Sequence, residues 1–212
     1  MPMNIFIRLS LMLCCAAYFT GCAQIEGAAS PPNITQSLIP NGKYARKLYR
    51  PLHPTYITIH STDSPSTGAN ARAHAAMLTS GTLKGRHNAI GYISWHFTVD
   101  DHSTFQSLPT NERGEHADYD GPGNLTSIGI EMCVNRGNNA QQTIERTARL
   151  TAALMNSYHI PITHVVPHMH WRQIRHDDHK DLGYKQCPHL LLEHGQLGPK
   201  WNAFLSKIQS YQ

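Results

Sequence analysis

Apolar and polar residues alternate along several short stretches of the chain, and this alternation is typical of β-strands with one buried face. In the clearest stretch, two isoleucines alternate with Tyr56, Thr58 and His60. The predicted strands are residues 56–60, 94–99, 127–134 and a short apolar segment at 163–166. Residues 104–108 follow a polar turn and are expected to return as the hairpin partner of 94–99.

Other segments repeat their apolar residues every three to four positions, which is the period of an amphipathic helix. The predicted helices are residues 69–79, 141–158 and 198–211. In the second of them, Ile144, Ala148 and Leu154 belong to the apolar stripe, while Glu145 and Arg149 lie on the polar side. Strands and helices that follow one another in this way, in a chain of 212 residues, predict one α/β domain.

The start of the chain has a different pattern. Residues 1–22 combine Arg8, an apolar run at 9–19 and small residues before Cys22. The run is short for a membrane span, so residues 1–22 are interpreted as an export signal. Its end resembles a bacterial lipobox, which implies a lipid on Cys22 and an anchor on the periplasmic side of the outer membrane.

An ordinary cleaved signal, with release of the protein, is the alternative, because Phe19 stands where a lipobox usually has leucine. Residues 23–45 are rich in Ala, Ser, Pro and Gly and are expected to form a flexible tether. Residues 46–212 are then the folded domain.

The composition is that of a globular protein, with 40% hydrophobic and 15% charged residues. A formal net charge of +4 with fifteen histidines is mildly basic, which favours an anionic polymer such as a cell wall. The basic residues form no block and no recognition motif, so the sequence does not indicate a nucleic-acid partner.

Five cysteines divide unevenly along the chain. Only Cys133 and Cys187 lie in the predicted domain, which is too few for a disulfide framework. One bridge between them is possible in an oxidising compartment. A free thiol at Cys187 is the preferred interpretation, because Cys187 follows a histidine-rich stretch at 164–189.

Imidazole and thiolate are ligand types that zinc takes, and a catalytic zinc keeps three protein ligands. The stretch 164–189 offers His168 and Cys187, and His60 ends a predicted strand upstream. Glu131 is a lone carboxylate within an otherwise apolar strand, where it is costly unless it is paired or used. A solvated, histidine-rich loop beside an unrelated buried cysteine would give the same composition.

Five short blocks occur in an order that resembles the zinc N-acetylmuramoyl-L-alanine amidases, which share a fold with phage-lysin amidases and peptidoglycan-recognition proteins. The blocks are YITIH at 56–60, SWHF at 94–97, SIGIEMCVN at 127–135, VVPH at 165–168 and KQCPH at 185–189. The resemblance covers most of residues 50–205, and the common order makes it specific.

The resemblance implies a central mixed β-sheet flanked by helices, with a zinc ion in a surface groove. By motif, His60, His168 and Cys187 match the zinc ligands, Glu131 the general base, and Lys185 the lysine near the cysteine ligand. The implied reaction is hydrolysis of the amide between N-acetylmuramic acid and L-alanine, in peptidoglycan or in muropeptides. A monomer is expected.

The chain departs from the family pattern in the long gap before Cys187. Residues 172–184 have the look of an inserted loop, and this leaves open whether His170, His176 or His179 replaces His168 as a ligand, although His168 is preferred.

The sequence leaves two roles open for each of two further residues. Trp95 stands where related branches have a tyrosine, and it is expected either to form a wall of the groove or to pack in the core. His116, in a polar loop, is expected to border the substrate peptide or to be a plain loop residue. The alternative function is a non-catalytic peptidoglycan-binding protein, in which the cysteine ligand is typically replaced.

Overall fold

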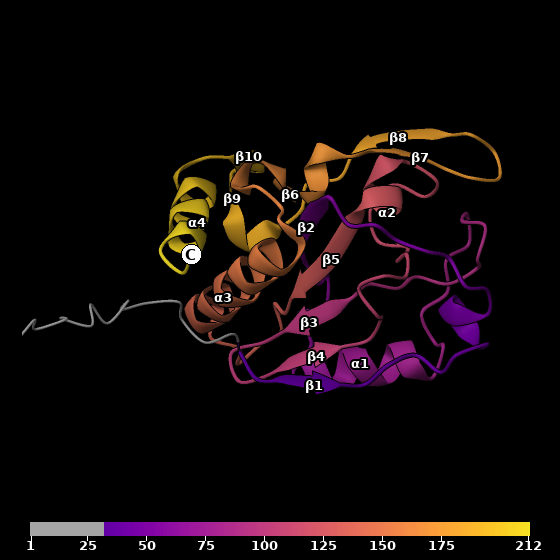
Figure 1. Cartoon of the computed structure of the whole chain (residues 1–212), viewed down its shortest axis with the longest axis horizontal. Coiled ribbons are helices and arrows are strands. Elements are labelled where there is room, and N and C mark those ends of the chain that lie inside the picture. The colour runs from indigo at the N-terminus through magenta and orange to yellow at the C-terminus, as the bar shows by residue number, and fades with distance from the viewer. Residues whose placement is uncertain (1–31) are drawn as a thin grey trace, which may run out of the picture.

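A mixed six-stranded β-sheet forms the centre of the computed structural model, which describes residues 32–212 (Figure 1). The strand order is β1-β4-β3-β5-β2-β6. The strands are β1 (Ile34–Gln36), β2 (Tyr56–Ser61), β3 (Phe97–Val99), β4 (Thr104–Gln106), β5 (Ser127–Met132) and β6 (Val165–Pro167). Strands β3 and β4 are antiparallel and the other neighbours are parallel. This is the α/β fold with a mixed sheet that was predicted.

Helices flank the sheet. They are α1 (Ala71–Thr79), α2 (Pro122–Thr126), α3 (Ala140–Tyr158) and α4 (Pro199–Gln209). Two small antiparallel pairs lie outside the main sheet: β7 (Arg172–Ile174) with β8 (Asp181–Tyr184), and β9 (Leu192–Glu193) with β10 (Gln196–Leu197). Within residues 32–212, none of the helices has the length and apolar character needed to cross a membrane.

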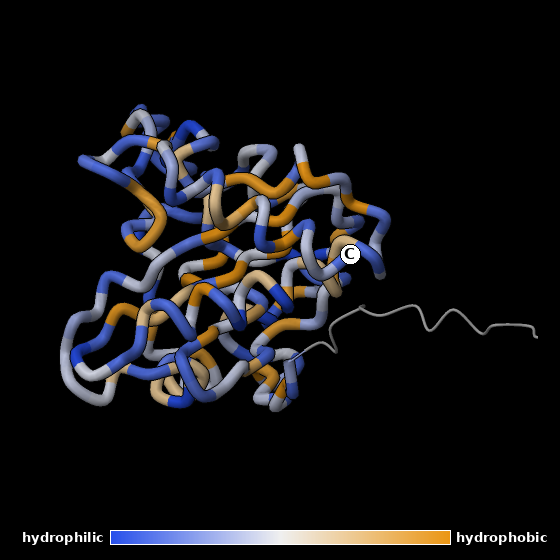
Figure 2. Tube along the Cα trace, turned by 90° about the vertical axis from the view of Figure 1, so that its left-hand side faces the viewer, coloured by the Kyte–Doolittle hydropathy of each residue, from blue (hydrophilic) through white to orange (hydrophobic). Residues whose placement is uncertain are grey.

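The two faces of the sheet differ in chemistry because successive side chains of a strand point to opposite sides. On one face, Ile57, Ile59 and Ile130 are fully buried in the main core with residues of α3 and α4. The opposite face carries Thr58, His60, Gly129 and Glu131 at the alternate positions. In Figure 2 the hydrophobic stretches run through the middle of the molecule. One face is therefore free to carry polar chemistry.

Strand register brings distant residues together on that polar face. His60 is the direct neighbour of Glu131 in the β2–β5 pair. Ile59 pairs with Pro167 of β6, so His168 begins one residue beyond the pairing, next to His60. Parallel pairing thus gathers residues from three separate parts of the sequence at one end of the sheet.

The predicted tether is wrong over its second half. Residues 34–36 form β1, which pairs with β4 at an edge of the sheet, and Ile39 is fully buried. A tether segment that supplies a strand and a buried side chain belongs to the folded domain. Residues 1–31, including the expected signal and Cys22, lie outside the described residues.

Two further expectations concern residues 172–184 and the two cysteines of the domain. Residues 172–184, expected to be an inserted loop, contain the antiparallel strands β7 and β8 and form a hairpin (Figure 1). The possible bridge between Cys133 and Cys187 does not form, because both thiols are free and buried.

Candidate active site

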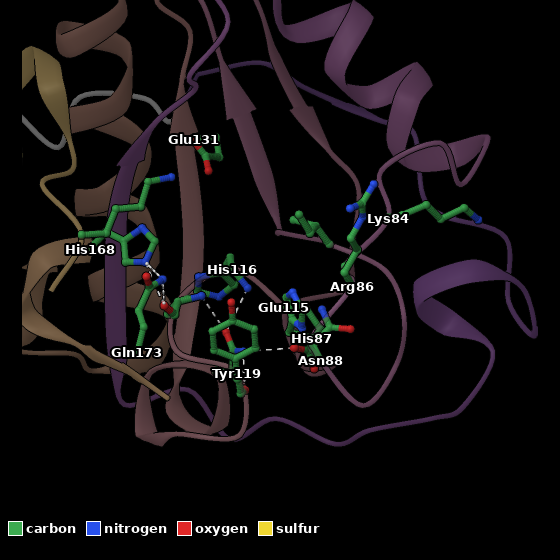
Figure 3. A pocket seen from close by; sticks show the side chains of 15 residues that line it. Lys84, Arg86, His87, Asn88, Glu115, His116, Tyr119, Glu131, His168 and Gln173 are labelled. Carbon is green, nitrogen blue, oxygen red and sulfur yellow. Dashed lines mark hydrogen bonds between the residues drawn. The ribbon is translucent and has the colours of Figure 1, made fainter. Parts of the chain in front are cut away.

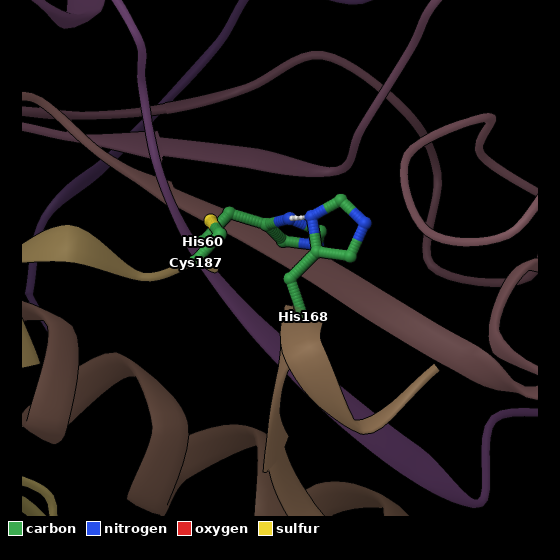
Figure 4. A group of neighbouring side chains, drawn as sticks. All are labelled: His60, His168 and Cys187. Carbon is green, nitrogen blue, oxygen red and sulfur yellow. Dashed lines mark hydrogen bonds between the residues drawn. The ribbon is translucent and has the colours of Figure 1, made fainter. Parts of the chain in front are cut away.

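Three candidate metal ligands converge at the end of the sheet. His60 comes from β2, His168 from the short 3-10 helix that follows β6, and Cys187 from the segment after β8. One ligand atom of each lies within 4.8 Å of the others, and all three residues are buried. Figure 4 shows the three side chains converging from separate elements.

The two imidazoles present the same ring nitrogen to each other. Nδ1 of His60 lies 2.9 Å from Nδ1 of His168. On its other side, Nε2 of His168 donates to the carbonyl oxygen of Ala117 at 2.8 Å, which leaves the Nδ1 lone pair of His168 free. Burial lowers the pKa of His60 well below its usual range and lowers the pKa of His168 to about 4. Both rings are therefore neutral, as metal ligation requires.

The thiol of Cys187 faces the same point. The backbone N–H of Ser61 donates to Sγ of Cys187 at 3.3 Å. Burial raises the pKa of this thiol to about 12, so the thiolate needs a nearby cation to form at neutral pH. Two neutral imidazoles and one thiol match the donor set of a three-ligand zinc site, and the residues present fit that ion.

Glu131 is the acidic side chain next to this cluster. Its Oε1 lies 3.9 Å from Nδ1 of His60, and its Oε2 has no hydrogen-bond partner within residues 32–212. Burial raises the pKa of Glu131 to about 8, and the positive charge of Lys185 opposes that rise. A largely buried carboxyl with a strongly shifted pKa in a pocket marks a candidate catalytic group.

Lys185 lies near the cluster but has a partner that the sequence did not reveal. Its Nζ donates to Oδ2 of Asp63 at 2.8 Å. Burial lowers the pKa of Lys185, yet the bond to Asp63 raises it above its ordinary value overall. Asp63 also lies 3.3 Å from Nδ1 of His189. The only signal for Asp63 was its place three residues after His60.

A cavity of about 230 Å³ opens beside these groups (Figure 3). Glu131, His168 and Lys185 line one part of it, and the segment 84–88 and residues 115–117 with Tyr119 line other parts. Gln173 of β7 also faces the cavity. The predicted groove is thus present, and the hairpin of β7 and β8 forms part of its rim.

The hairpin makes this rim by reaching the segment 84–88. Nδ1 of His87 lies 2.9 Å from Oδ2 of Asp177, and the backbone N–H of His176 donates to the carbonyl of His87 at 3.0 Å. His176 also contacts Asp120. His170, His176 and His179 are all exposed and lie outside the three-residue cluster.

Trp95 is not a wall of the groove. Its side chain is 5% exposed and packs in a separate apolar cluster with Ile39, Leu78 and Leu108. Its Nε1 donates to Oγ1 of Thr98 at 2.7 Å, so its polar atom is satisfied internally. The core-packing alternative describes Trp95 correctly.

His116 lines the cavity, but its ring is mostly buried, at 9% exposure. Its Nδ1 lies 3.0 Å from Nε2 of His60. This contact with a candidate ligand was not foreseen from the sequence, where His116 appeared as a residue at the border of the substrate.

Comparison with known proteins shows which family the chain belongs to. The family model for N-acetylmuramoyl-L-alanine amidase (Amidase_2) matches residues 49–190. The chain belongs to this N-acetylmuramoyl-L-alanine amidase family. Within the family it is similar to the N-acetylmuramoyl-L-alanine amidase XlyA of Bacillus subtilis, with 37% identity over 83% of this chain and 51% of XlyA.

It is also similar to the amidase CwlH of Bacillus subtilis, with 36% identity over 84% of this chain and 61% of CwlH. The chain therefore spans about half to three fifths of the length of these relatives. The solved catalytic domain of XlyA has a TM-score of 0.67 and 36% identity, and the match covers 83% of this chain and 99% of that domain. A solved mutant endolysin from Bacillus subtilis gives a TM-score of 0.68 at 37% identity, and the match covers 84% of this chain and 99% of the endolysin chain.

Proposed function

We propose that this protein hydrolyses the amide bond between N-acetylmuramic acid and L-alanine in peptidoglycan or muropeptides, with one zinc ion held by His60, His168 and Cys187. The observation that carries the proposal is the buried cluster of these three residues next to Glu131, at a cavity, in a chain of this family. The turnover or remodelling of cell wall is the corresponding role.

Zinc, when bound, polarises the substrate carbonyl and lowers the pKa of a water molecule to about 7. Glu131 is the general base in this proposal: it accepts a proton from the attacking water and passes it to the leaving nitrogen of L-alanine. Its position supports the role, because its Oε1 is 3.9 Å from a candidate ligand nitrogen and its Oε2 has no partner in the described part of the chain.

Lys185 donates to the oxyanion that develops as the carbonyl carbon becomes tetrahedral. The side chain of Lys185 is 41% exposed and lines the cavity, so its Nζ can exchange a hydrogen bond with Asp63 for one with substrate. Asp63 keeps the ammonium charged and holds it near the cluster until substrate arrives.

We further propose that residues 1–22 direct export and that a lipid on Cys22 anchors the protein to the periplasmic side of the outer membrane. The support is the sequence alone: an apolar run followed by Thr20, Gly21 and Cys22. The protein acts as a monomer in this proposal, because one chain supplies the whole candidate site. Fractionation of wild type and Cys22→Ala tests the anchor, and equal solubility of the two would contradict it.

Mass spectrometry of digested peptidoglycan tests the activity. Purified protein with one zinc per chain should release free stem peptides that begin with L-alanine and leave intact lactyl groups on the glycan. The matched control is Cys187→Ser, which should bind the polymer but release no peptide. Binding without release by the zinc-loaded wild type would identify the protein as the non-catalytic alternative.

A further inference from the structure

His116 contacts the candidate ligand His60 at Nε2, the ring nitrogen that does not face His168. We propose that His116 is a positioning residue: its Nδ1 orients the ring of His60 and can accept a hydrogen bond from Nε2–H of His60 when a metal ion takes the Nδ1 lone pair. The inference rests on the metal centre proposed above. Its basis is the 3.0 Å contact between Nε2 of His60 and Nδ1 of His116, with the two rings nearly perpendicular at 88°. A hydrogen bond on the far side of a ligating ring is the usual way to orient that ring.

His116 is itself held firmly in place. Its backbone N–H donates to Oδ1 of Asn124 at 2.9 Å, which ties it to α2. Its ring lies against the backbone of Gly129 in β5, where a Cβ atom would come within 2.8 Å of three ring carbons. Any other residue at position 129 would push the ring away from His60. The glycine on the polar face of β5 is therefore explained by the space that His116 needs.

The proton positions explain why an imidazole stands at position 116. Without a metal ion, two Nδ1 atoms 2.9 Å apart need one proton between them. The lone pair on His168 makes His60 the donor, so Nδ1 of His60 carries the proton and Nε2 of His60 accepts from Nδ1–H of His116. All three histidines are then linked by hydrogen bonds.

The direction of one of these bonds would reverse in the metal-loaded protein. If the two Nδ1 atoms hold the ion, the proton of His60 would reside on Nε2 and would be donated to Nδ1 of His116. His116 in turn carries its own proton on Nε2. In both His60 and His116, Nδ1 loses a proton and Nε2 gains one, so the number of protons on each ring is unchanged. Nε2 of His116 has no hydrogen-bond partner within residues 32–212, so its lone pair is free to take that proton.

Two variants separate positioning from packing. His116→Asn keeps an amide close to the position of Nδ1, and this amide can accept or donate. His116→Phe keeps a ring of similar volume but offers no hydrogen bond. Zinc affinity, measured by competition with a chelator, should fall about 10–100-fold in His116→Phe and stay within a few-fold of wild type in His116→Asn. Thermal unfolding of the metal-free proteins reports whether each variant folds.

A packing role predicts the reverse order. In that case His116→Phe would bind zinc like wild type, and the smaller side chain of His116→Asn would lower stability and affinity; this result would overturn the inference. Activity lost in His116→Phe at unchanged zinc affinity would overturn it too, while leaving the proposed reaction intact. A wild-type protein that binds no zinc would overturn both.

Nuclear magnetic resonance of protein with ¹⁵N-labelled histidine gives a second test that does not depend on activity. Zinc should move the proton of His60 from Nδ1 to Nε2 and that of His116 from Nδ1 to Nε2. His96 is the internal control, because its Nε2 donates to the carbonyl of Glu112 at 2.8 Å and its Nδ1 accepts from the N–H of Gly129 at 3.0 Å. Unchanged tautomers at His60 and His116 in zinc-loaded protein would overturn the inference.

Discussion

Two groups of histidines in this chain differ in burial and in hydrogen-bond partners. The inner histidines, which lie on or beside the polar face of the sheet, are His60, His96, His116 and His168. The outer histidines, which lie in or just before the hairpin of β7 and β8, are His170, His176 and His179. All of the inner group are buried and all of the outer group are exposed.

Hydrogen-bond partners separate the groups as clearly as burial does. His60, His96 and His168 each have both ring nitrogens within hydrogen-bond distance of a protein atom. His176 contacts Asp120 at the surface. The comparison teaches that a dense histidine tract is a weak sign of a metal centre. A ligand needs a defined tautomer, and that comes from partners distant in sequence.

The strongest test of this division is zinc content. His168→Ala and Cys187→Ser should lose zinc and fall to background amidase activity, because each removes one of three ligands from a buried site. The outer variants His176→Ala and His179→Ala are the controls and should keep one zinc per chain. Metal analysis of the purified proteins decides the matter. Zinc lost from an outer variant but kept in His168→Ala would show that an outer histidine, and not His168, is the ligand.

Glu131 lies next to the inner histidine His60, and its proposed role as general base can be tested by substitution. Glu131→Gln keeps the shape of the side chain but cannot accept the proton, so turnover should fall about 10²–10⁴-fold. Zinc content and the thermal unfolding midpoint should stay at wild-type values. Steady-state kinetics on muropeptides provides the measurement. A fall below about tenfold with zinc bound would mean that the carboxylate is structural.

Two lysines provide a matched pair of substitutions that tests the proposed role of Lys185. Lys185→Met removes the proposed oxyanion donor, and kcat should fall about 10²–10³-fold. Lys180→Met changes an exposed lysine between β7 and β8 and should leave kcat unchanged. An equal effect of the two substitutions would indicate that the overall positive charge, and not the position of Lys185, supports the reaction.

The stability of the protein should depend on pH through His96. Burial lowers the pKa of His96 from 6.5 to about 4 in the folded protein. The unfolded chain therefore binds more protons between these values, and stability is lost as the pH falls from 6.5 toward 4. The loss from this one group is about 3 kcal/mol at full extent.

Urea unfolding at several pH values checks this prediction. His96→Asn should be less stable at neutral pH but should show a smaller loss on acidification than wild type. His179→Ala, an outer variant, should keep the wild-type dependence. A slope that is the same in His96→Asn as in wild type would contradict the assignment to His96.

The sequence alone determined the parts of the fold that depend on local pattern. Alternation in residues 56–60 placed Ile57 and Ile59 opposite His60, and alternation in residues 127–134 placed Ile130 opposite Glu131, as the structure has them. The helical period likewise located α1, α3 and α4 to within a few residues. Side-chain direction in a strand or helix follows from its own backbone geometry, so a short window contains the information.

Candidate ligands were also recognisable from residue type and motif order. The sequence could not choose among the histidines after β6, because that choice depends on pairing between β2 and β6. The register of Ile59 with Pro167 brings His168 beside His60, while the exposed hairpin carries His176 and His179 away.

Tertiary structure alone decided the roles of several other residues. In the folded protein, Ile39 and Trp95 are buried in one apolar cluster. Lys185 is hydrogen-bonded to Asp63, and His116 contacts Nε2 of His60. Each of these contacts joins residues far apart in the chain. Their free energies depend on burial and on partners that arrive only when the sheet has formed, and no local pattern of apolar and polar residues records them.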